Sequence, residues 1–354
     1  MKALTLTPLL VLLGLGCGTS GVDDDDATEY PDIPLYDFEA AAPWFECPES
    51  FEDGTDEVRV FDREEQHFGG ENLRQISTDI DLPTGDFAQI GLWLELRCPE
   101  GGQCDDWDRA GSVQMALDPS NPDGGYREIA RFVTPYGRGM CQYIDVTALA
   151  SVLQGPQHFT SWIDTWVGPG HSDGDGWVTS VSLLYTPGEP RNSSVIDIWG
   201  RRSITVGEIE PESNVDAQVE PFTVSIPENA RRVRAHVVTT GHSFGNTANC
   251  AEFCSMRHDV IVNDTIHDWE GWRDDCEQNP VSPQAGTWEY PRNGWCPGAI
   301  AVGKVLNVLE SVSPGEDAVI NFDILRSNGS QYDNTAPVDL LPHTYVSLKL
   351  YIEE

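Results

Sequence analysis

Apolar residues alternate with polar or small residues in several stretches of this chain, and this alternation is the feature that most constrains its fold. Every second side chain of an extended strand lies on the same face, so such a stretch can bury one face and expose the other. The clearest apolar series are Ile90, Leu92, Leu94, Leu96; Val233, Ala235, Val237; Ala318, Ile320, Phe322, Ile324; and Val346, Leu348, Leu350, Ile352. The one helical candidate is short, residues 146–153 with Asp145 as N-cap. We therefore predict an antiparallel, all-β protein of the sandwich type.

Length and one shift in composition predict two domains. A chain of 354 residues has room for about two domains, each able to bury a core. A strand-like run from Val178 to Tyr185 ends at Thr186–Pro190, a stretch whose Pro and Gly are typical of a boundary. We expect an N-terminal domain of residues 46–187 and a C-terminal domain of residues 188–354.

A charged start and a short apolar run at the N-terminus predict a secretory signal. The run is too short to remain as a membrane span. It ends at Leu15–Gly18, which resembles the bacterial lipobox, where cleavage leaves a cysteine, here Cys17, for lipidation; Gly14 departs from the usual Leu. We expect residues 1–17 to hold the signal peptide and lipobox of an outer-membrane lipoprotein, with a plain secreted protein as the alternative.

The chain is strongly acidic, and its charge excludes two classes of partner. It has 21 Lys and Arg against 58 Asp and Glu, which gives a net charge of −37. This charge disfavours nucleic acids and anionic membrane surfaces, so we expect membrane contact only through a lipid on Cys17, and a monomer. Residues 18–45 include four consecutive Asp at 23–26; they have almost nothing to bury and predict a flexible acidic tether.

The cysteines predict an exported, disulfide-bonded protein. Nine are present, and setting aside Cys17 as the lipid anchor leaves an even eight. Spacing suggests three bridges, Cys98–Cys104, Cys250–Cys254 and Cys276–Cys296. Cys47 and Cys141 remain and pair by elimination.

The stretch Cys98–Arg109, CPEGGQCDDWDR, concentrates residues that can carry chemistry. Asp105, Asp106 and Asp108 lie close enough to repel one another, so at least one is expected to have a raised pKa. A raised pKa suits a carboxylate for acid/base work near neutral pH. The strand-like run Ser112–Leu117 follows, which places Asp108 where a loop enters a strand. The alternative is a solvated acidic turn.

Three separated motifs carry a resemblance to a known family. They are CDDWDR at 104–109, CAEFC at 250–254 and RNGWCPG at 292–298. Three further blocks follow the same order: REIARFVTPY at 127–136, IDVTAL at 144–149 and TSWIDTWVG at 160–168. Together they resemble the peptide:N-glycosidase F family of bacterial amidases, from about Val58 to the C-terminus. The resemblance implies two eight-stranded jelly rolls side by side, with the active site in the groove between them.

The resemblance also implies a reaction. The family hydrolyses the bond between the side-chain nitrogen of a glycosylated Asn and its first N-acetylglucosamine, converting the Asn to Asp, so N-glycosylated proteins or glycopeptides are the implied substrates. Asp108 matches the essential catalytic carboxylate and Glu252 the second acidic residue. The other matches are two polar site residues, Arg109 and Arg292, and two nearby aromatic residues, Trp107 and Trp295. We expect no cofactor and no metal.

These residue types suit amide hydrolysis. An amide is a poor electrophile, so the reaction needs a carboxylate to activate water, donors for the oxyanion and an acid for the departing nitrogen. Asp108 and Glu252 can supply the first and the last of these. Arg109 and Arg292 suit the oxyanion or the carbonyl groups of the sugar; the alternative for either is a structural ion pair.

Aromatic residues and three departures from the family pattern bear on the glycan. Trp166 and Trp295 suit the flat apolar faces of sugars, with a place in the core as the alternative. Asp164 stands where the family has Glu, and Phe253 and Thr240 stand where it has Trp. Asp164 and Phe253 complete the expected substrate-binding set. We expect the chemistry to be kept and the glycan preference to shift.

Weaker signals define the alternatives. His171–Trp177, HSDGDGW, spaces two Asp like a calcium loop but lacks the final Glu, so an acidic loop insertion is favoured. His242 and His258 are interpreted as buried, hydrogen-bonded histidines, because the close His pair of a metal site is missing. The alternative functions are a non-catalytic glycan-binding surface lipoprotein and a copper monooxygenase on a similar pair of jelly rolls.

Overall fold

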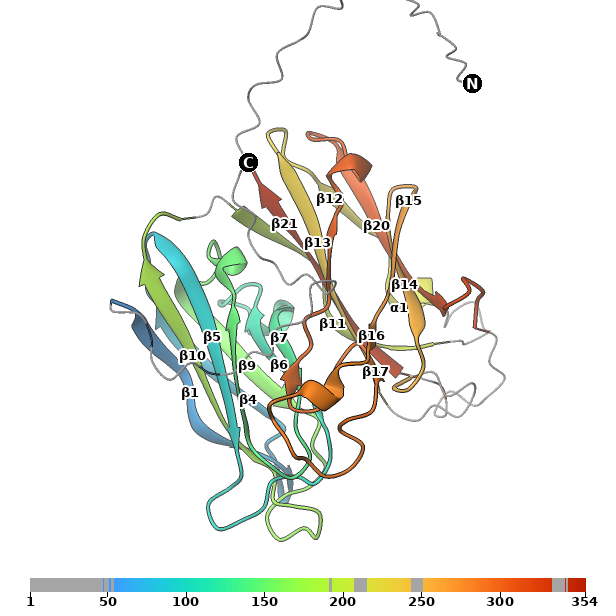
Figure 1. The fold of residues 1–354 in the computed structure, drawn as a ribbon. Helices are drawn as coiled ribbons and strands as arrows, with labels where there is room; N and C mark the ends of the chain where they lie inside the picture. The colour runs from blue at the N-terminus through green and yellow to red at the C-terminus, as the bar shows by residue number, and fades with distance from the viewer. Residues whose placement is uncertain are drawn as a thin grey trace, which may run out of the picture. The chain divides into compact units, whose positions relative to one another are not determined.

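A computed structural model describes residues 47, 51, 54–190, 193–206, 215–242, 251–332, 341 and 343–354 (Figure 1). The expected signal peptide and lipobox (1–17), the expected tether (18–45) and Cys250 lie outside these residues. Within the described ranges, no helix is both long and apolar enough to cross a membrane.

The first sandwich consists of two antiparallel sheets, one of four strands and one of five, that enclose one core (Figure 1). One contains, in spatial order, β1 (Asp56–Gln66), β10 (Trp177–Pro187), β5 (Phe87–Arg97) and β8 (Met140–Asp145). The other contains β18 (Ala299–Ile300), β7 (Tyr126–Val133), β6 (Ala110–Ala116), β9 (Gly155–Ile163) and β4 (Gln75–Leu82). The alternating side chains of β5, Ile90 to Leu96, are buried as their pattern predicts.

The second sandwich also consists of two antiparallel sheets, each of four strands. One of its sheets contains β11 (Ser193–Thr205), β21 (His343–Glu353), β13 (Arg232–His242) and β19 (Lys304–Asn307). The other contains β12 (Phe222–Ser225), β20 (Asp317–Arg326), β14 (Met256–Val262) and β15 (Thr265–Glu270). The prediction of an all-β fold with two antiparallel sandwiches is confirmed. The domain boundary at residues 187 and 188 stays a prediction; it falls between the end of β10 and the start of β11.

The remaining elements are short. They are the strands β2 (Phe68–Gly69), β3 (Glu71–Asn72), β16 (Trp272–Arg273) and β17 (Arg292–Asn293), the helix α1 (Val215–Gln218), and single 3-10 turns at Pro122–Gly124, Thr147–Leu149, Cys276–Gln278 and Leu309–Ser311. The predicted helix over residues 146–153 is therefore wrong in length. The Asp145 carboxylate accepts the Thr147 amide at 2.8 Å and starts one turn, but no further helix follows before β9.

Polar and strand contacts join the two sandwiches. β18 pairs with β7 of the first sandwich, with Ala299 opposite Val133. Arg131 of β7 is 2% exposed; it pairs with Glu128 and donates to the Val238 and Tyr345 carbonyls of the second sandwich at 3.1 and 2.7 Å. A buried ion pair is tolerated when hydrogen bonds satisfy its remaining polar atoms. These contacts hold the two sandwiches together beside the candidate site.

Three disulfides agree with the predicted pairing: Cys47–Cys141, Cys98–Cys104 and Cys276–Cys296. Cys254 is also disulfide-bonded, but its predicted partner, Cys250, lies outside the described residues. Disulfides persist in oxidising surroundings, so these bonds fit an extracellular protein.

Candidate active site

Asp105 organises the loop that leads into β6. Its buried carboxylate accepts hydrogen bonds from the Trp107 amide at 3.0 Å and from the Thr165 hydroxyl at 2.7 Å. Arg109 completes the set with two bonds to the same carboxylate, from Nε at 2.7 Å and from Nη2 at 3.2 Å. This arrangement holds the backbone on both sides of Asp108, which lies two residues before β6 as the sequence predicts.

Asp108 lies in a largely buried position next to a tyrosine and an arginine. Its side chain is 14% exposed. Oδ2 accepts the Tyr136 hydroxyl at 2.7 Å and lies 3.5 Å from Arg292 Nη2. Burial raises the pKa of Asp108 above its ordinary value, and the hydrogen bond from Tyr136 and the charge of Arg292 only partly oppose this.

The raised pKa was expected in this loop, but its cause is different. Mutual repulsion among Asp105, Asp106 and Asp108 was the expected cause, whereas burial is the main one. Asp105 is paired with Arg109 and Asp106 is exposed to solvent. The carboxylate with which Asp108 does interact comes from the second sandwich.

That carboxylate is Glu252, which lies a few residues before β14. Oε1 accepts Arg292 Nε at 2.9 Å, and the side chain is 11% exposed. Burial, together with the negative charge of Asp108, raises the pKa of Glu252 to about 7. Two carboxylates that interact in this way titrate as a pair and share protons between them. At neutral pH the pair therefore offers both a proton acceptor and a proton donor.

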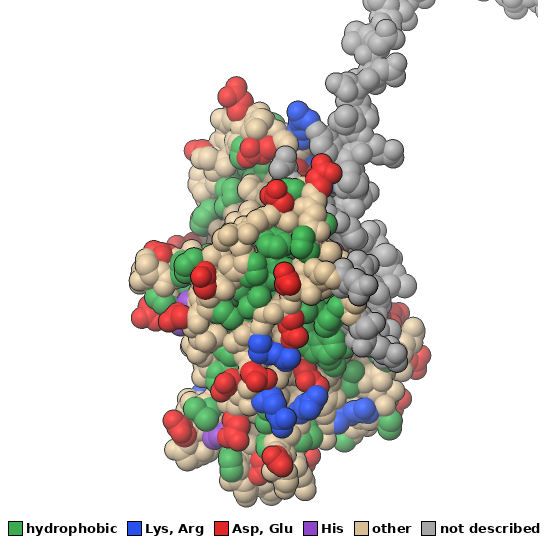
Figure 2. All heavy atoms as spheres, turned by 90° about the vertical axis from the view of Figure 1, so that its left-hand side faces the viewer, with side chains coloured by type: hydrophobic (Ala, Val, Ile, Leu, Met, Phe, Trp, Pro, Cys, Tyr) green, Lys and Arg blue, Asp and Glu red, His purple; other side chains and the backbone are tan. Residues whose placement is uncertain are grey.

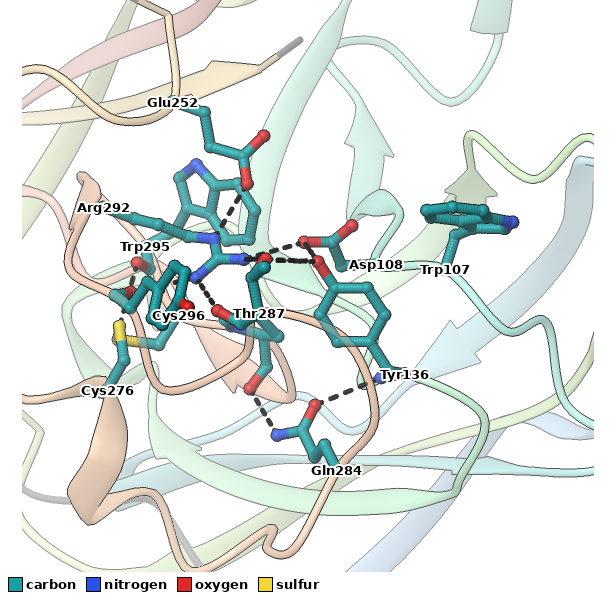
Figure 3. A network of polar contacts seen from close by, with 12 residues as sticks. Trp107, Asp108, Tyr136, Glu252, Cys276, Gln284, Thr287, Arg292, Trp295 and Cys296 are labelled. Atoms are coloured by element: carbon teal, nitrogen blue, oxygen red, sulfur yellow. Dashed lines mark hydrogen bonds and ion pairs between the residues drawn. A yellow bond between two sulfur atoms is a disulfide. The ribbon is translucent and has the colours of Figure 1, made fainter. Parts of the chain in front are cut away.

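Arg292 is a fully buried hub whose donors are all engaged (Figure 3). A guanidinium has five N–H donors. Nε bonds to Glu252; Nη1 bonds to the Thr287 and Tyr290 carbonyls at 2.7 and 2.9 Å. Nη2 bonds to the Tyr136 hydroxyl at 3.2 Å and to Thr287 Oγ1 at 2.8 Å. The expectation that Arg292 can hold an oxyanion or a sugar carbonyl is therefore wrong for this arrangement, because it positions Glu252 and Tyr136 instead.

Arg109 differs from Arg292 because it keeps part of its guanidinium available. Its side chain is 19% exposed, and only Nε and Nη2 face Asp105. Arg109 also lines a pocket of about 260 Å³. The pocket lining is Asp108, Arg109, Ala110, Asp164, His242, Glu252, Trp295 and Tyr345, from both sandwiches. Arg109 is thus the cation that can meet a polar group in this pocket.

The aromatic residues expected near the site fall into two groups. Trp107 and Trp166 are 51% and 52% exposed and can offer ring faces to a ligand. Trp295 is 1% exposed; it donates Nε1 to the Gly241 carbonyl at 2.6 Å and stacks on His242 at 5.2 Å between ring centroids. Phe253 packs against Arg292, whose Cζ lies 5.0 Å from the ring centroid. Trp295 and Phe253 thus support the wall of the pocket from behind. For Trp295 this burial favours the alternative of a core residue over an open platform for a sugar.

Asp164 is tied to the exposed Trp166 through Arg74. The guanidinium carbon of Arg74 lies 4.5 Å from the Trp166 ring and 4.7 Å from the Phe68 ring. Arg74 Nη1 lies 3.7 Å from Asp164 Oδ1. Burial raises the pKa of Asp164, and the charge of Arg74 opposes the rise. Neither Arg74 nor Phe68 belongs to any motif that singled out the site.

The acidic segment His171–Trp177 supports the same loop as Asp105. The Asp175 carboxylate accepts the amides of Gln103 at 2.8 Å and of Gly170 at 2.7 Å. The Asp173 carbonyl accepts the Asp106 amide at 2.8 Å. This use of the acidic residues favours the interpretation as a loop insertion.

The two histidines differ from each other. His242 bonds to Thr240 Oγ1 at 2.9 Å, and burial lowers its pKa to about 3. His258 is buried among rings, but neither ring nitrogen has a hydrogen-bond partner among the described residues, so the expectation of a hydrogen bond is wrong there. Trp269 and Phe322 pack on it at 5.1 and 6.2 Å between centroids.

Known proteins show the same sequence pattern and fold. Residues 210–328 match a family model described as "Peptide-N-glycosidase F, C terminal". The chain is 25% identical over 300 residues to the peptide-N(4)-(N-acetyl-beta-D-glucosaminyl)asparagine amidase F of Elizabethkingia miricola, with 79% of this chain and 81% of that protein covered.

Two solved structures have a similar fold. PNGase F, described as a glycosylasparaginase from Flavobacterium meningosepticum, matches with a TM-score of 0.71 and 21% identity over 85% of this chain and 96% of that one. The family model, the curated relative and this structure together support the peptide:N-glycosidase F family for this chain. A second structure, PNGF-II, matches with a TM-score of 0.64 and 18% identity over 85% of this chain and 66% of that one. Members this distant share the fold, and the chain is a distant homologue of an amidase.

Sequence comparison with the peptide:N-glycosidase F family missed three residues of the network. Tyr136 ends the block REIARFVTPY, which resembles the family. Thr287 lies in a loop without a motif, and Asp105 was seen only as one of three repelling acids. Each acts through contacts between distant segments, such as the 2.7 Å bond from Tyr136 to Asp108.

Proposed function

We propose that this chain is a peptide-N-glycosidase that hydrolyses the bond between the side-chain nitrogen of a glycosylated Asn and its first N-acetylglucosamine. The observation that carries the proposal is the pair of buried carboxylates, Asp108 and Glu252, which share Arg292 beside a pocket. The family relationship to an amidase supports the same reaction class. N-glycosylated proteins or glycopeptides are the proposed substrates.

The proposed reaction uses the carboxylate pair as base and acid. Asp108 in its ionised form removes a proton from a water molecule, whose oxygen attacks the amide carbon of the glycosylated Asn side chain. The carbonyl oxygen becomes an oxyanion, which the unengaged part of Arg109 stabilises. Glu252, protonated in part at neutral pH, gives its proton to the departing nitrogen. The C–N bond breaks, and the products are an Asp side chain and a glycosylamine that later loses ammonia.

The other residues position this pair. Arg292 holds Glu252 and Tyr136, and Tyr136 holds Asp108. We propose that Trp107 and Trp166 receive the glycan at the rim, that Asp164 binds it in the pocket, and that Trp295 and Phe253 form the wall behind it. The shorter Asp164 and the missing ring at Thr240 favour a glycan preference that differs from that of the relatives.

The test is glycan release without metal. In EDTA, the purified mature protein is expected to release intact N-glycans from a denatured glycoprotein, and each glycosylated Asn is expected to become Asp, read by mass spectrometry. Glu252→Gln is expected to lose nearly all activity, whereas Asp164→Glu is expected to change it little. Binding of the glycoprotein without any release would instead identify a glycan-binding protein, and release with Asn unchanged would identify a different glycosidase.

A further inference from the structure

A second groove, of about 400 Å³, lies at the same end of the first sandwich as the candidate active site. Its lining includes Arg97, Arg138, Met140, Cys141, Pro280 and Val281, and the Cys47–Cys141 disulfide closes one side. The groove is larger than the pocket beside Asp108, and its volume is within the range of ligand sites. No step of the proposed reaction uses it.

The groove is continuous with the catalytic network through one turn and one loop. Tyr136 contacts Asp108, and Arg138 follows two residues later, so their Cα atoms are at most about 7 Å apart. Arg138 Nη1 donates to the Pro283 carbonyl at 2.6 Å, and the Tyr136 amide donates to Gln284 Oε1 at 3.1 Å. The loop that forms one wall of the groove therefore also holds the tyrosine that touches Asp108.

The groove lies on the side of the network away from Glu252. Figure 3 shows Glu252 at one end of the drawn contacts and Gln284 at the other, with Arg292 and Tyr136 between them. Gln284 Nε2 donates to the Val281 carbonyl at 2.7 Å, and Val281 lines the groove. A glycosylated Asn extends from its amide bond in two directions, toward the sugar and toward the polypeptide. A sugar in the pocket beside Glu252 leaves this side for the polypeptide.

We propose that this groove binds the polypeptide of the glycoprotein substrate beside its glycosylated Asn and favours acidic residues there, a proposal that rests on the proposed function. Arg138 supplies the positive charge that would attract an acidic residue. Among the described residues it forms no ion pair, and its one hydrogen bond is to the Pro283 carbonyl. Arg97, by contrast, bonds to Glu95 at 2.7 Å. Met140 and Val281, which are 5% and 9% exposed, contribute apolar atoms to the lining.

The surroundings make this guanidinium unusual. The chain has a net charge of −37, and on the face drawn in Figure 2 the blue basic side chains lie among red acidic ones. Glu95 also lines the groove but pairs with Arg97, so the charge of Arg138 stays available to a ligand. Hydrogen bonds between charged groups are the stronger ones. The groove thus recognises a carboxylate beside an apolar side chain, which is the chemistry of an acidic peptide.

The experiment compares three synthetic glycopeptides with one glycan and one length, in which Asp, Ser or Lys flanks the glycosylated Asn. Wild type is expected to have its lowest KM for the Asp peptide. Arg138→Gln is expected to raise that KM about tenfold, the loss of roughly one charge-assisted contact. The kcat, and the KM for the Ser peptide, are expected to stay within about twofold.

Two matched controls separate this effect from a general loss of positive charge. Arg97→Gln removes a guanidinium from the same groove that Glu95 already neutralises, and Arg59→Gln removes one paired with Glu57 on an exposed surface. Both are expected to leave the preference for Asp unchanged. Equal loss of preference in all three variants would mean long-range attraction and would overturn a specific role for Arg138.

A binding measurement separates this proposal from the proposed function. The unglycosylated Asp peptide, labelled for fluorescence anisotropy, is titrated into full-length Asp108→Asn with and without Arg138→Gln. Binding that Arg138→Gln weakens supports the groove even if wild type releases no glycan. Glycan release with equal KM for the three peptides overturns the groove and leaves the function standing. A lower KM after all four Asp at 23–26 are replaced by Ser would identify the chain's own acidic segment as the occupant and also overturn the proposal.

Discussion

Arg131 and Arg292 are both buried arginines beside the junction of the two sandwiches, but they meet different numbers of carboxylates. Arg131 bonds to both oxygens of Glu128, at 3.0 and 2.6 Å, and Ser347 adds a hydroxyl to the same carboxylate. Arg292 makes one bond to Glu252 at 2.9 Å and lies 3.5 Å from Asp108. Arg131 therefore pairs with one acid, whereas Arg292 lies against two.

The pKa values of Glu128 and Glu252 differ in the way that the number of neighbouring carboxylates predicts. Burial alone raises the pKa of Glu128, but the charge and hydrogen bonds of Arg131, with the Ser347 hydroxyl and the charge of Arg201, outweigh burial and lower it. Burial and Asp108 together raise the pKa of Glu252 to about 7, despite Arg292. A buried arginine thus stabilises a single carboxylate in its ionised form. It does not keep both members of a carboxylate pair ionised, so the pair can bind and release one proton near neutral pH. The first arrangement suits a structural joint and the second suits acid/base chemistry.

The largest expected effect is that of Asp108→Asn on the rate. Asparagine keeps the shape and removes the base, so glycan release is expected to fall by about 10²–10⁴-fold. The melting temperature is expected not to fall, because one of two repelling carboxylates is gone. Measurement of kcat together with thermal unfolding checks both. Undiminished release would mean that the catalytic residues lie elsewhere.

Glu128→Gln is expected to act on stability. It leaves the Arg131 charge buried without a counter-ion, which destabilises a protein by about 3–5 kcal/mol. The free energy of unfolding from a urea titration measures this loss. The matched control is Glu57→Gln, which removes the exposed partner of Arg59 and is expected to change stability by less than about 1 kcal/mol. Equal effects at the two positions would remove the distinction between the buried and exposed pairs.

The pH dependence of stability is expected to have opposite signs in the two clusters. The folded pKa of Glu128 is lowered, so its contribution is present above the unfolded pKa and is lost as pH falls through the folded value. The folded pKa of Glu252 is raised, so its ionisation destabilises the fold as pH rises from about 4.5 to about 7. Glu252→Gln is expected to remove the fall in unfolding free energy over this window, measured against wild type. If the unfolding free energy of wild type and of Glu252→Gln changed with pH at the same slope, the raised pKa of Glu252 would be contradicted.

Tyr136→Phe is expected to have the smallest effect of these variants. The effect is expected in the pH dependence of kcat/KM. The hydrogen bond from Tyr136 lowers the pKa of Asp108, so its removal is expected to move the acid limb of kcat/KM to higher pH by up to about one pH unit. The free energy of unfolding is expected to change by about 1 kcal/mol. A lower kcat with an unmoved acid limb would assign Tyr136 to another step.

The two clusters also show what sequence can and cannot predict here. Period-two alternation in stretches such as 90–96 predicts the strands, because burial of one face leaves that pattern in any antiparallel sandwich. Short motifs singled out Asp108, Glu252 and Arg292. The engagement of all five Arg292 donors could not be predicted, because it depends on carbonyls and hydroxyls that distant loops supply only in the folded chain. The ion-pair partner of Arg131, Glu128, lies in the same family-like block, but the Val238 and Tyr345 carbonyls that complete its contacts come from distant strands.

A titration of the Glu252 side chain tests the shared proton itself. The δ-carbon of Glu252 can be followed by NMR as a function of pH in wild type and in Asp108→Asn, with assignment by loss of the signal in Glu252→Gln. Wild type is expected to show a transition near pH 7, and Asp108→Asn is expected to move it to lower pH, because the neighbouring charge is gone. A transition near 4.3, the ordinary value for Glu, in both proteins would contradict the coupled pair on which the proposed chemistry depends.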